Sequence, residues 1–376
     1  MNVKIEKIMH FILLIKMLPL RYFKTLSMGS PKNNRSVVIW LYVGLVMIMI
    51  QVVIGGITRL TGSGLSITEW KPILGAFPPM NEQAWLDAFD KYKEIAQFKN
   101  LNSHFSLSDF KFIFFWEWLH RDWARLMGLV FIFPFIYFLI SKKIQQNMVK
   151  PMIMLFLLGG LQGAIGWIMV KSGLNDENLY VSHIRLAIHF ISALILLCYV
   201  FWFALKLSIS ENQVLHVPEL KKINVLLLVL LTFQLIYGAF MAGLHAAFAA
   251  ITWPDINGML WPTGMFSQGS FLEDITHNLI TVQFIHRGLA YIICIPIIIW
   301  VLKAQKLAAG TLLYNFRFLP VLFLVVQILL GVLTVLNTSS EIPLIYAILH
   351  QFVGMLFLLS LVYTLFLSRG KLSRFR

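Results

Sequence analysis

Long runs of apolar side chains recur along the chain and are separated by short polar segments. A membrane-crossing α-helix needs roughly 20 mostly apolar residues, and eight runs of the sequence meet that requirement. They cover residues 37–57, 118–140, 151–170, 184–205, 223–244, 280–302, 318–336 and 343–367. The runs do not alternate between apolar and polar residues, as the strands of a membrane barrel would. The pattern therefore predicts an all-α integral membrane protein with eight transmembrane helices.

The composition agrees with a membrane protein. Apolar residues make up 59% of the chain and charged residues 13%, against about 45–50% and about 25% in soluble domains. The net charge is +14, but the basic residues lie between apolar runs, so we expect membrane lipid and no nucleic acid as a partner. Cys198 and Cys294 both lie inside apolar runs, which excludes a secreted disulfide framework.

Lysine and arginine are distributed unevenly between the two sides of the predicted membrane domain. If both termini are cytoplasmic, the inner segments hold 20 of these residues and the outer loops hold 7. Basic residues concentrate on the cytoplasmic side of membrane proteins, which favours this orientation. A chain rich in Lys, Ile and Asn, without an Arg- and Ser-rich presequence, favours a bacterial cell inner membrane over a mitochondrial one. Residues 8–20 predict an interfacial inner-face helix.

Several features recur in the same order in the two halves of the chain. The sequence Glu-Trp-Leu-His-Arg at 117–121 is matched 166 residues later by Gln-Phe-Ile-His-Arg at 283–287. Gln162 and Gln327 are separated by 165 residues, and His189 and His350 by 161. This internal repeat predicts two pseudo-symmetric four-helix bundles.

The repeat also sets the expected domain boundaries. The N-terminal bundle would span 37–205 and include a long outer loop, 58–111, with a surface helix within 81–100. The C-terminal bundle would span 223–367. The remaining parts are a cytoplasmic N-terminal segment at 1–36, an inner linker at 206–222 and a basic cytoplasmic tail at 368–376.

Four of the ten histidines lie inside apolar runs, each 16–20 residues from the inner end of its run. They are His120, His189, His286 and His350. At a rise of about 1.5 Å per residue, all four lie at a similar depth in the outer part of the membrane. Two imidazoles per bundle suit axial ligation of a haem, which predicts one haem site in each half. The alternative is four histidines hydrogen-bonded between helices; zinc or copper would need a third ligand.

Charged residues accompany these histidines. Arg121, Arg185 and Arg287 suit bidentate pairing with haem propionates, although arginines at this depth also extend toward the interface without a ligand. Glu117 is three residues from His120 and is replaced by Gln283 in the second half. A carboxylate at that position predicts a general base, so we expect reactive chemistry in the first half and electron transfer in the second. The alternative is a plain ion pair with Arg121.

Over residues 37–367 the chain resembles the heme A synthases of alphaproteobacteria and mitochondria. The most specific stretch is Gly-Gly-Ile-Thr-Arg-Leu-Thr-Gly-Ser-Gly-Leu-Ser at 55–66, followed by Glu-Trp-Lys-Pro at 69–72 and by the Gly-Ala-Phe-Pro-Pro segment at 75–79. The segments around Glu117, Arg185, His286 and His350 also match. Loop 58–111 lacks the cysteine pair of some family branches, so a thiol-based mechanism is not expected.

The resemblance implies an oxidoreductase acting on CH or CH2 groups. Such an enzyme oxidises the C8 methyl group of haem O to a formyl group by successive hydroxylations, with water as the oxygen source. The product, haem A, serves cytochrome oxidase assembly. An electron acceptor, not identified by the sequence, would be required, and heme O synthase would be the expected donor of substrate.

The resemblance also implies roles for individual residues. Haem b would be held by His286 and His350, with Arg287 nearby. The substrate haem O would lie between His120 and His189. The substrate-binding arginines would be Arg59, Arg121 and Arg185, and Glu117 would be the catalytic residue. Glu69 is a further candidate for substrate binding.

Two other functions fit part of this pattern. A dihaem b-type membrane electron-transfer protein, such as a quinol oxidoreductase, would use the same four histidines without modifying haem. A haem transporter would bind haem without turnover. The haems extracted from the protein distinguish the synthase from the electron-transfer protein, because a synthase should contain haem O or haem A besides haem B. A transporter would differ in needing no redox partner.

Overall fold

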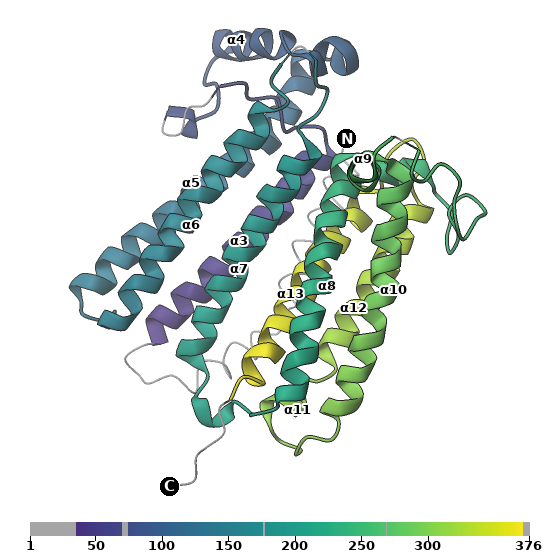
Figure 1. Ribbon diagram of the computed structural model, residues 1–376. Helices are drawn as coiled ribbons and strands as arrows, with labels where there is room; N and C mark the ends of the chain where they lie inside the picture. Colours follow the sequence, from purple (N-terminus) through teal and green to yellow (C-terminus); the bar gives the residue numbers. More distant parts are fainter. Residues whose placement is uncertain (1–34, 70–73, 176, 268, 371–376) are drawn as a thin grey trace.

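The structure is a computed structural model that describes residues 35–69, 74–175, 177–267 and 269–370. Within these ranges the regular elements are helical, apart from two isolated bridges, His216 with Arg369 and Ile256 with Met259. Figure 1 shows long helices packed side by side, with short helices and loops at both ends. The interfacial helix expected at residues 8–20 lies outside the described residues.

Eight of the described helices are long and apolar enough to cross a membrane, which confirms the predicted all-α membrane fold. Their bounds agree with most of the expected spans to within a few residues. They are α3 (Arg35–Leu60), α5 (Leu107–Ile140), α6 (Gln146–Lys171), α7 (His183–Ser208), α8 (Pro218–Gly243), α10 (Leu279–Ala304), α12 (Leu319–Leu336) and α13 (Leu344–Leu367).

Helix α5 begins at Leu107, well before the start expected at residue 118. The Ser106 hydroxyl accepts a hydrogen bond from the backbone N–H of Asp109, and the Asp109 carboxylate accepts one from the backbone N–H of Ser106. This capping box satisfies two N–H groups at the helix start. Hydropathy alone missed the added turns because they project beyond the apolar run.

The added turns of α5 support a small outer layer. Helix α4 (Glu82–Lys93) begins at Asn81, whose side chain accepts from the N–H of Ala84, and it lies within the segment expected to be helical. Phe89, Tyr92 and Phe110 are buried together, and Phe89 and Phe110 stack with ring centres 5.0 Å apart. The shorter elements are η3 (Leu74–Ala76), η4 (Phe98–Asn102), η5 (Glu211–Gln213), η6 (Ala246–Ala249), α9 (Phe271–His277) and α11 (Leu312–Asn315).

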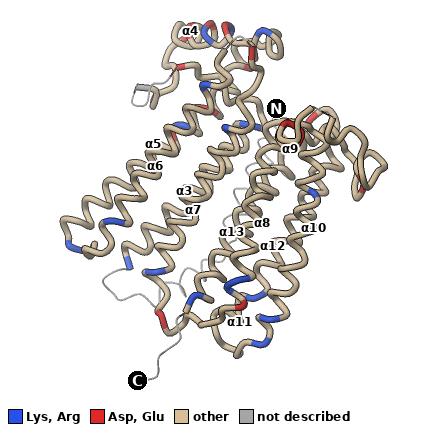
Figure 2. The backbone as a smooth tube through the Cα atoms, in the orientation of Figure 1, with Lys and Arg blue, Asp and Glu red and all other residues tan. Residues whose placement is uncertain are grey.

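The long helices fall into two groups of four. In Figure 1, α3, α5, α6 and α7 lie on one side, and α8, α10, α12 and α13 lie on the other. This arrangement is compatible with the two bundles expected from the internal repeat. The end that carries α11 is rich in lysine and arginine, whereas most aspartates and glutamates lie toward the end that carries α4 and α9 (Figure 2).

Close packing joins the two groups at two glycines. A Cβ atom on Gly56 of α3 would overlap the side chain of Gln351 on α13, whose Nε2 donates to the Val52 carbonyl at 2.7 Å. A Cβ atom on Gly243 of α8 would lie 2.5 Å from the Cβ of His183 on α7. The absence of a side chain at these positions lets helices of opposite groups approach each other.

Replacing Gly243 with alanine should destabilise the protein. The added methyl group would meet the Cβ and Cα atoms of His183, and overpacking of this kind costs about 1–3 kcal/mol. Gly44→Ala in α3 is the matched control, because a Cβ there meets no atom of the described chain within 4 Å. Thermal unfolding in detergent should show a lower Tm for Gly243→Ala alone. Equal Tm values for the two variants would contradict the packing analysis.

Candidate functional site

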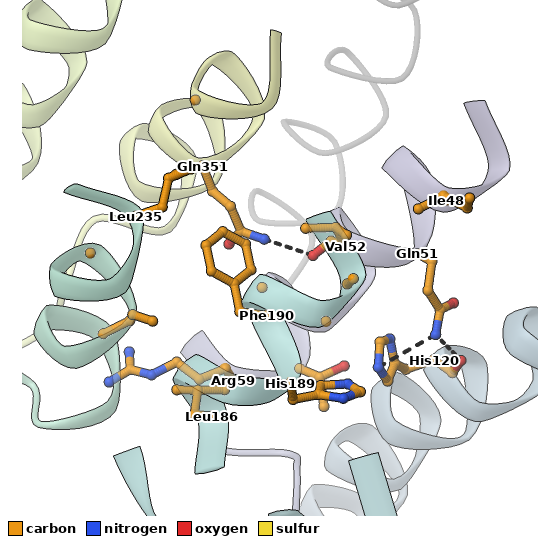
Figure 3. Close-up of a pocket in the computed structure, with 18 of the residues that line it drawn as sticks. Ile48, Gln51, Val52, Arg59, His120, Leu186, His189, Phe190, Leu235 and Gln351 are labelled. Carbon is orange, nitrogen blue, oxygen red and sulfur yellow. Dashed lines mark hydrogen bonds between the residues drawn. The ribbon is translucent and has the colours of Figure 1, made fainter. Parts of the chain in front are cut away.

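A cavity of about 900 Å³ runs between the helices and is lined by all four intramembrane histidines. Two come from the first group, His120 on α5 and His189 on α7, and two from the second, His286 on α10 and His350 on α13. The structure thus gathers the histidines selected from the sequence into two pairs on one cavity. Figure 3 shows His120 and His189 turned toward each other across its first-half part.

The second pair has a spacing suited to a shared metal ion. The ring centres of His286 and His350 are 6.4 Å apart, and the planes are inclined by 71°. Imidazole nitrogens bind metals at about 2 Å, so rings on opposite sides of one ion have centres about 6 Å apart. The Nδ1 atom of His350 is 2.9 Å from the Gln327 carbonyl. That contact orients the ring. The Nε2 atom lies 3.3 Å from the side-chain nitrogen of Gln327 and would exchange this contact for a metal on binding.

Each histidine faces a glycine on a neighbouring helix, which is α3, α6, α8 or α12. A Cβ atom on Gly55 would be 2.9 Å from Cε1 of His120, and one on Gly166 would be 2.8 Å from Cε1 of His189. The corresponding distances are 3.4 Å from Gly238 to His286 and 3.0 Å from Gly331 to His350. The missing side chains make room for the imidazoles at the cavity wall.

A glutamine lies four residues before each of these glycines. The four pairs are Gln51 with Gly55, Gln162 with Gly166, Gln234 with Gly238, and Gln327 with Gly331. Sequence reasoning noted only Gln162 and Gln327 and missed the fourfold pattern, although the Gln-x-x-x-Gly spacing is legible in the sequence. Residues four apart share a helix face, so each glutamine and glycine contact the same histidine.

The glutamine amides hold the histidines through hydrogen bonds. Nε2 of Gln162 donates to the His189 carbonyl at 2.8 Å and lies 3.1 Å from its Nδ1. Nε2 of Gln51 donates to the His120 carbonyl at 3.0 Å (Figure 3). In the second half, Nε2 of Gln234 is 3.2 Å from Nδ1 of His286. These contacts restrict the imidazoles before any ligand binds.

The donor set fits a haem better than a bare metal ion. Among the described residues, no group of three or more His, Cys, Asp or Glu side chains could hold a metal. A haem supplies its own equatorial nitrogens and needs only the two axial imidazoles. Nδ1 of His120 is buried and has no hydrogen-bond partner within the described part of the chain. An unsatisfied buried nitrogen in an apolar cavity is typical of a ligand site.

Glu117 holds the outer loop that follows α3. Its Oε2 accepts from the Ser66 hydroxyl at 2.7 Å and from the backbone N–H of Ile67 at 2.9 Å. Its Oε1 accepts from Arg121 Nη2 at 2.7 Å. The side chain is only 3% exposed, and the carboxylate also borders the cavity. The expected ion pair with Arg121 is present, together with two donors that the sequence did not reveal.

The second half makes a different contact at the equivalent position. Gln283 is fully buried and its Nε2 donates to the Ala250 carbonyl at 2.9 Å. Its Oε1 atom is buried and has no hydrogen-bond partner among the described residues. The two halves therefore have similar histidine pairs but differ at the neighbouring position, which is the carboxylate Glu117 in the first half and the neutral amide Gln283 in the second.

The arginines beside the histidines donate to backbone carbonyls. Arg121 donates to Ile67 and Glu69 at 2.9 and 3.1 Å. Arg287 donates to Thr252, Asp255 and Ala250 at 2.9, 2.7 and 3.2 Å. These bonds pin the outer loops over the histidine pairs.

Arg185 also donates to a backbone carbonyl, that of Ile168, at 3.0 Å. The expected pairing of Arg121, Arg185 and Arg287 with haem propionates stays a prediction. The structure adds loop anchoring to the roles of Arg121 and Arg287.

Arg59 occupies a different position. It lines the cavity from α3 beside Leu186 (Figure 3), and its Nη2 atom is buried without a hydrogen-bond partner in the described ranges. Burial and the nearby Arg59 charge lower the pKa of His245 to about 4, so this imidazole is neutral at pH 7.

Comparison with known proteins identifies related chains. A model of the family described as "Cytochrome oxidase assembly protein" matches residues 38–362. The heme A synthase of Flavobacterium johnsoniae is 40% identical over 338 residues, covering 89% of this chain and 98% of its own length. That of Bartonella tribocorum is 39% identical over 324 residues (85% and 88%), and that of Rhodospirillum centenum is 39% identical over 346 residues (91% and 90%).

Replacing Glu117 with glutamine should loosen residues 61–69. In wild type the carboxylate accepts from Ser66, Ile67 and Arg121. The amide of the variant replaces one acceptor oxygen with an N–H donor, and a hydrogen bond to a charged group contributes about 1.5–3 kcal/mol. We expect amide hydrogen exchange in this segment to accelerate by about tenfold or more. Ser66→Ala removes one neutral donor and should give a smaller increase. Unchanged exchange in Glu117→Gln would show that the carboxylate does not hold the loop.

Proposed function

The chain belongs to the heme A synthase family of cytochrome oxidase assembly proteins, and from this premise we propose that it converts haem O into haem A in a membrane. The observation that carries the proposal is the paired construction of the cavity. Two histidine pairs share the same glutamine and glycine supports, yet among the described residues the one carboxylate that lines the cavity, Glu117, lies beside the first pair. This difference suits one site for chemistry and one for electron transfer.

We assign the first histidine pair to the substrate. Haem O would lie between His120 and His189, with Glu117 at the edge of the cavity as the catalytic residue. Arg59, whose Nη2 has no partner among the described residues, would pair with a propionate. Arg121 and Arg185 would bind substrate as well, while Arg121 also orients the Glu117 carboxylate through the 2.7 Å ion pair.

We assign the second pair to haem b. His286 and His350 would be its axial ligands, with Arg287 beside them, and their 6.4 Å ring spacing supports this role. A haem b held there supplies one-electron transfer to an acceptor outside the chain. Gln283 has no group that gains or loses a proton near neutral pH, which suits a site that passes electrons without altering its haem.

The proposed reaction balances with water as the oxygen source. The C8 methyl group and one water give a hydroxymethyl group, two protons and two electrons. A second hydroxylation with another water gives a geminal diol and releases the same number of protons and electrons. Loss of water from the diol leaves the formyl group. In this proposal Glu117 would accept a proton during hydroxylation. Three donors hold its carboxylate in a fixed position, and it would exchange one of them for the proton.

The cellular setting is part of the same proposal. We place the chain in a bacterial inner membrane with both termini cytoplasmic, so that the lysine- and arginine-rich end carrying α11 faces inward (Figure 2). Residues 37–205 would form the substrate bundle and 223–367 the haem b bundle. Heme O synthase is the proposed donor of the scarce, apolar substrate, because direct transfer avoids release into the lipid.

The haems extracted from purified protein test the activity. In a host that supplies haem O, wild type should contain haem A together with haem B, as identified by chromatography and mass. Glu117→Gln should retain haem B and accumulate haem O or a hydroxylated intermediate, with haem A lowered by about 100-fold or more, within the range of a lost acid–base group. Ser66→Ala, which keeps the carboxylate, should retain most of the haem A.

Other results would change the assignment. If wild type contains only haem B at both sites, the chain is a dihaem electron-transfer protein and Glu117 is a structural ion-pair partner. If Ser66→Ala stops haem A formation as completely as Glu117→Gln, loop anchoring rather than proton transfer explains the role of Glu117.

The division of labour between the halves can be tested separately. His286→Ala should lose the absorption spectrum of a bis-histidine haem b, because one axial ligand is removed. His120→Ala should keep that spectrum while forming no haem A, since only the substrate pair is altered. Reduced and oxidised absorption spectra, combined with haem extraction, report both effects. Loss of haem b in His120→Ala but not in His286→Ala would reverse the assignment.

A further inference from the structure

The cavity wall along α6 carries glycines where the equivalent helix of the second half, α12, carries larger side chains. Gly159 and Gly163 are separated by four residues and lie on the helix face that carries Gln162 and Gly166. Both glycines line the cavity, and a Cβ atom built on either one meets no atom of the described chain within 4 Å. The space beside the first histidine pair therefore continues along α6 for about two turns toward the inner end.

The second half fills the same positions with side chains. The 165-residue offset that relates Gln162 to Gln327 and Gly166 to Gly331 places Leu324 at the position of Gly159 and Ile328 at that of Gly163. Leu324 is only 6% exposed, and Ile328 packs against the hydrophobic core. The first-half and second-half parts of the one cavity thus differ by two branched aliphatic side chains on one wall.

The remaining walls of the extra space are apolar. Met127 and Phe131 of α5 and Phe156 of α6 line the cavity in this region. Gly160, also on α6, adds a further open position. At its outer end the space reaches His120, which lines the same cavity. We call the space bounded by Gly159, Gly160, Gly163, Met127, Phe131 and Phe156 the α6 groove.

We propose that the α6 groove holds the isoprenoid tail of the substrate haem and selects haem O over haem B at the first site. The proposal rests on the function proposed above. Haem O carries a long isoprenoid alcohol on its ring, and haem B has a vinyl group at that position. If the haem O ring lies between His120 and His189, its isoprenoid tail needs an apolar channel that begins at the edge of the ring. The α6 groove provides such a channel.

The selection would depend on shape rather than on the hydrophobic effect. Lipid chains solvate an isoprenoid tail as well as apolar side chains do, so membrane interiors discriminate by packing. Leu324 and Ile328 would exclude a tail from the second site and leave room for haem B. The absence of side chains at Gly159 and Gly163 would admit the tail at the first site. The presence or absence of the tail would therefore decide which haem binds in which half.

Transplanting the second-half residues tests the groove. Gly159→Leu and Gly163→Ile, singly and together, are made in the full-length protein, and purified samples are titrated with haem O and with haem B. We expect the Kd for haem O at the first site to rise by roughly 10-fold or more, while the Kd for haem B there changes by less than about twofold. Gly163→Ala is a milder variant and should give an intermediate effect.

A glycine outside the cavity provides the matched control. Gly288 of α10 does not line the cavity, and a Cβ atom on it meets no atom of the described chain within 4 Å. Gly288→Val should leave binding of both haems unchanged. The absorption spectrum of the haem at the second pair shows in every variant that the fold is retained.

The outcomes separate the groove from the proposed function. If wild type forms haem A and the groove variants bind haem O as tightly as wild type, the tail lies elsewhere and the groove proposal is wrong. An equal loss of haem O and haem B binding would also overturn it, because the substitutions would then act on the ring site. If wild type forms no haem A but the variants lose haem O binding selectively, the groove stands and the synthase assignment fails.

Discussion

Polar groups inside a membrane-spanning helix bundle have little access to bulk water, so most of their hydrogen bonds must come from the protein itself. Each of the four histidines accordingly contacts a glutamine amide and is fitted against a glycine. Arg121 and Arg287 meet the same constraint by donating to loop carbonyls. The hydrogen bonds that make the helices compatible with a membrane are therefore the same ones that position the candidate ligands.

The internal repeat explains how one framework accommodates two roles. The positions that hold the imidazoles are alike in both halves, which preserves a histidine pair in each. The positions that differ lie around the pairs: Glu117 against Gln283 beside the histidines, and Gly159 and Gly163 against Leu324 and Ile328 along the wall. The framework thus keeps what a haem needs and varies what surrounds it.

The membrane helices could be predicted from the sequence because hydropathy is a local property. The four histidines could be selected as site residues because a titratable side chain inside an apolar run is visible in the sequence. It did not predict the early start of α5, which depends on a capping box and on packing beneath α4. It identified Glu117 and Arg121 as neighbours from helical spacing, but it could not find Ser66 and Ile67, which reach the carboxylate through the fold. The arginine contacts with loop carbonyls were missed for the same reason, since a carbonyl has no signature in the sequence.

Gln351 gives the two halves a shared mechanical element. It follows His350 directly in the chain, and its amide donates to the carbonyl of Val52, the residue after Gln51, which in turn holds His120 (Figure 3). One hydrogen bond thereby joins α13, beside the second histidine pair, to α3, beside the first. Coupling free energies between binding sites are reciprocal. If a ligand at the second pair raises the affinity of the first pair through this hydrogen bond, a ligand at the first pair raises the affinity of the second by the same factor.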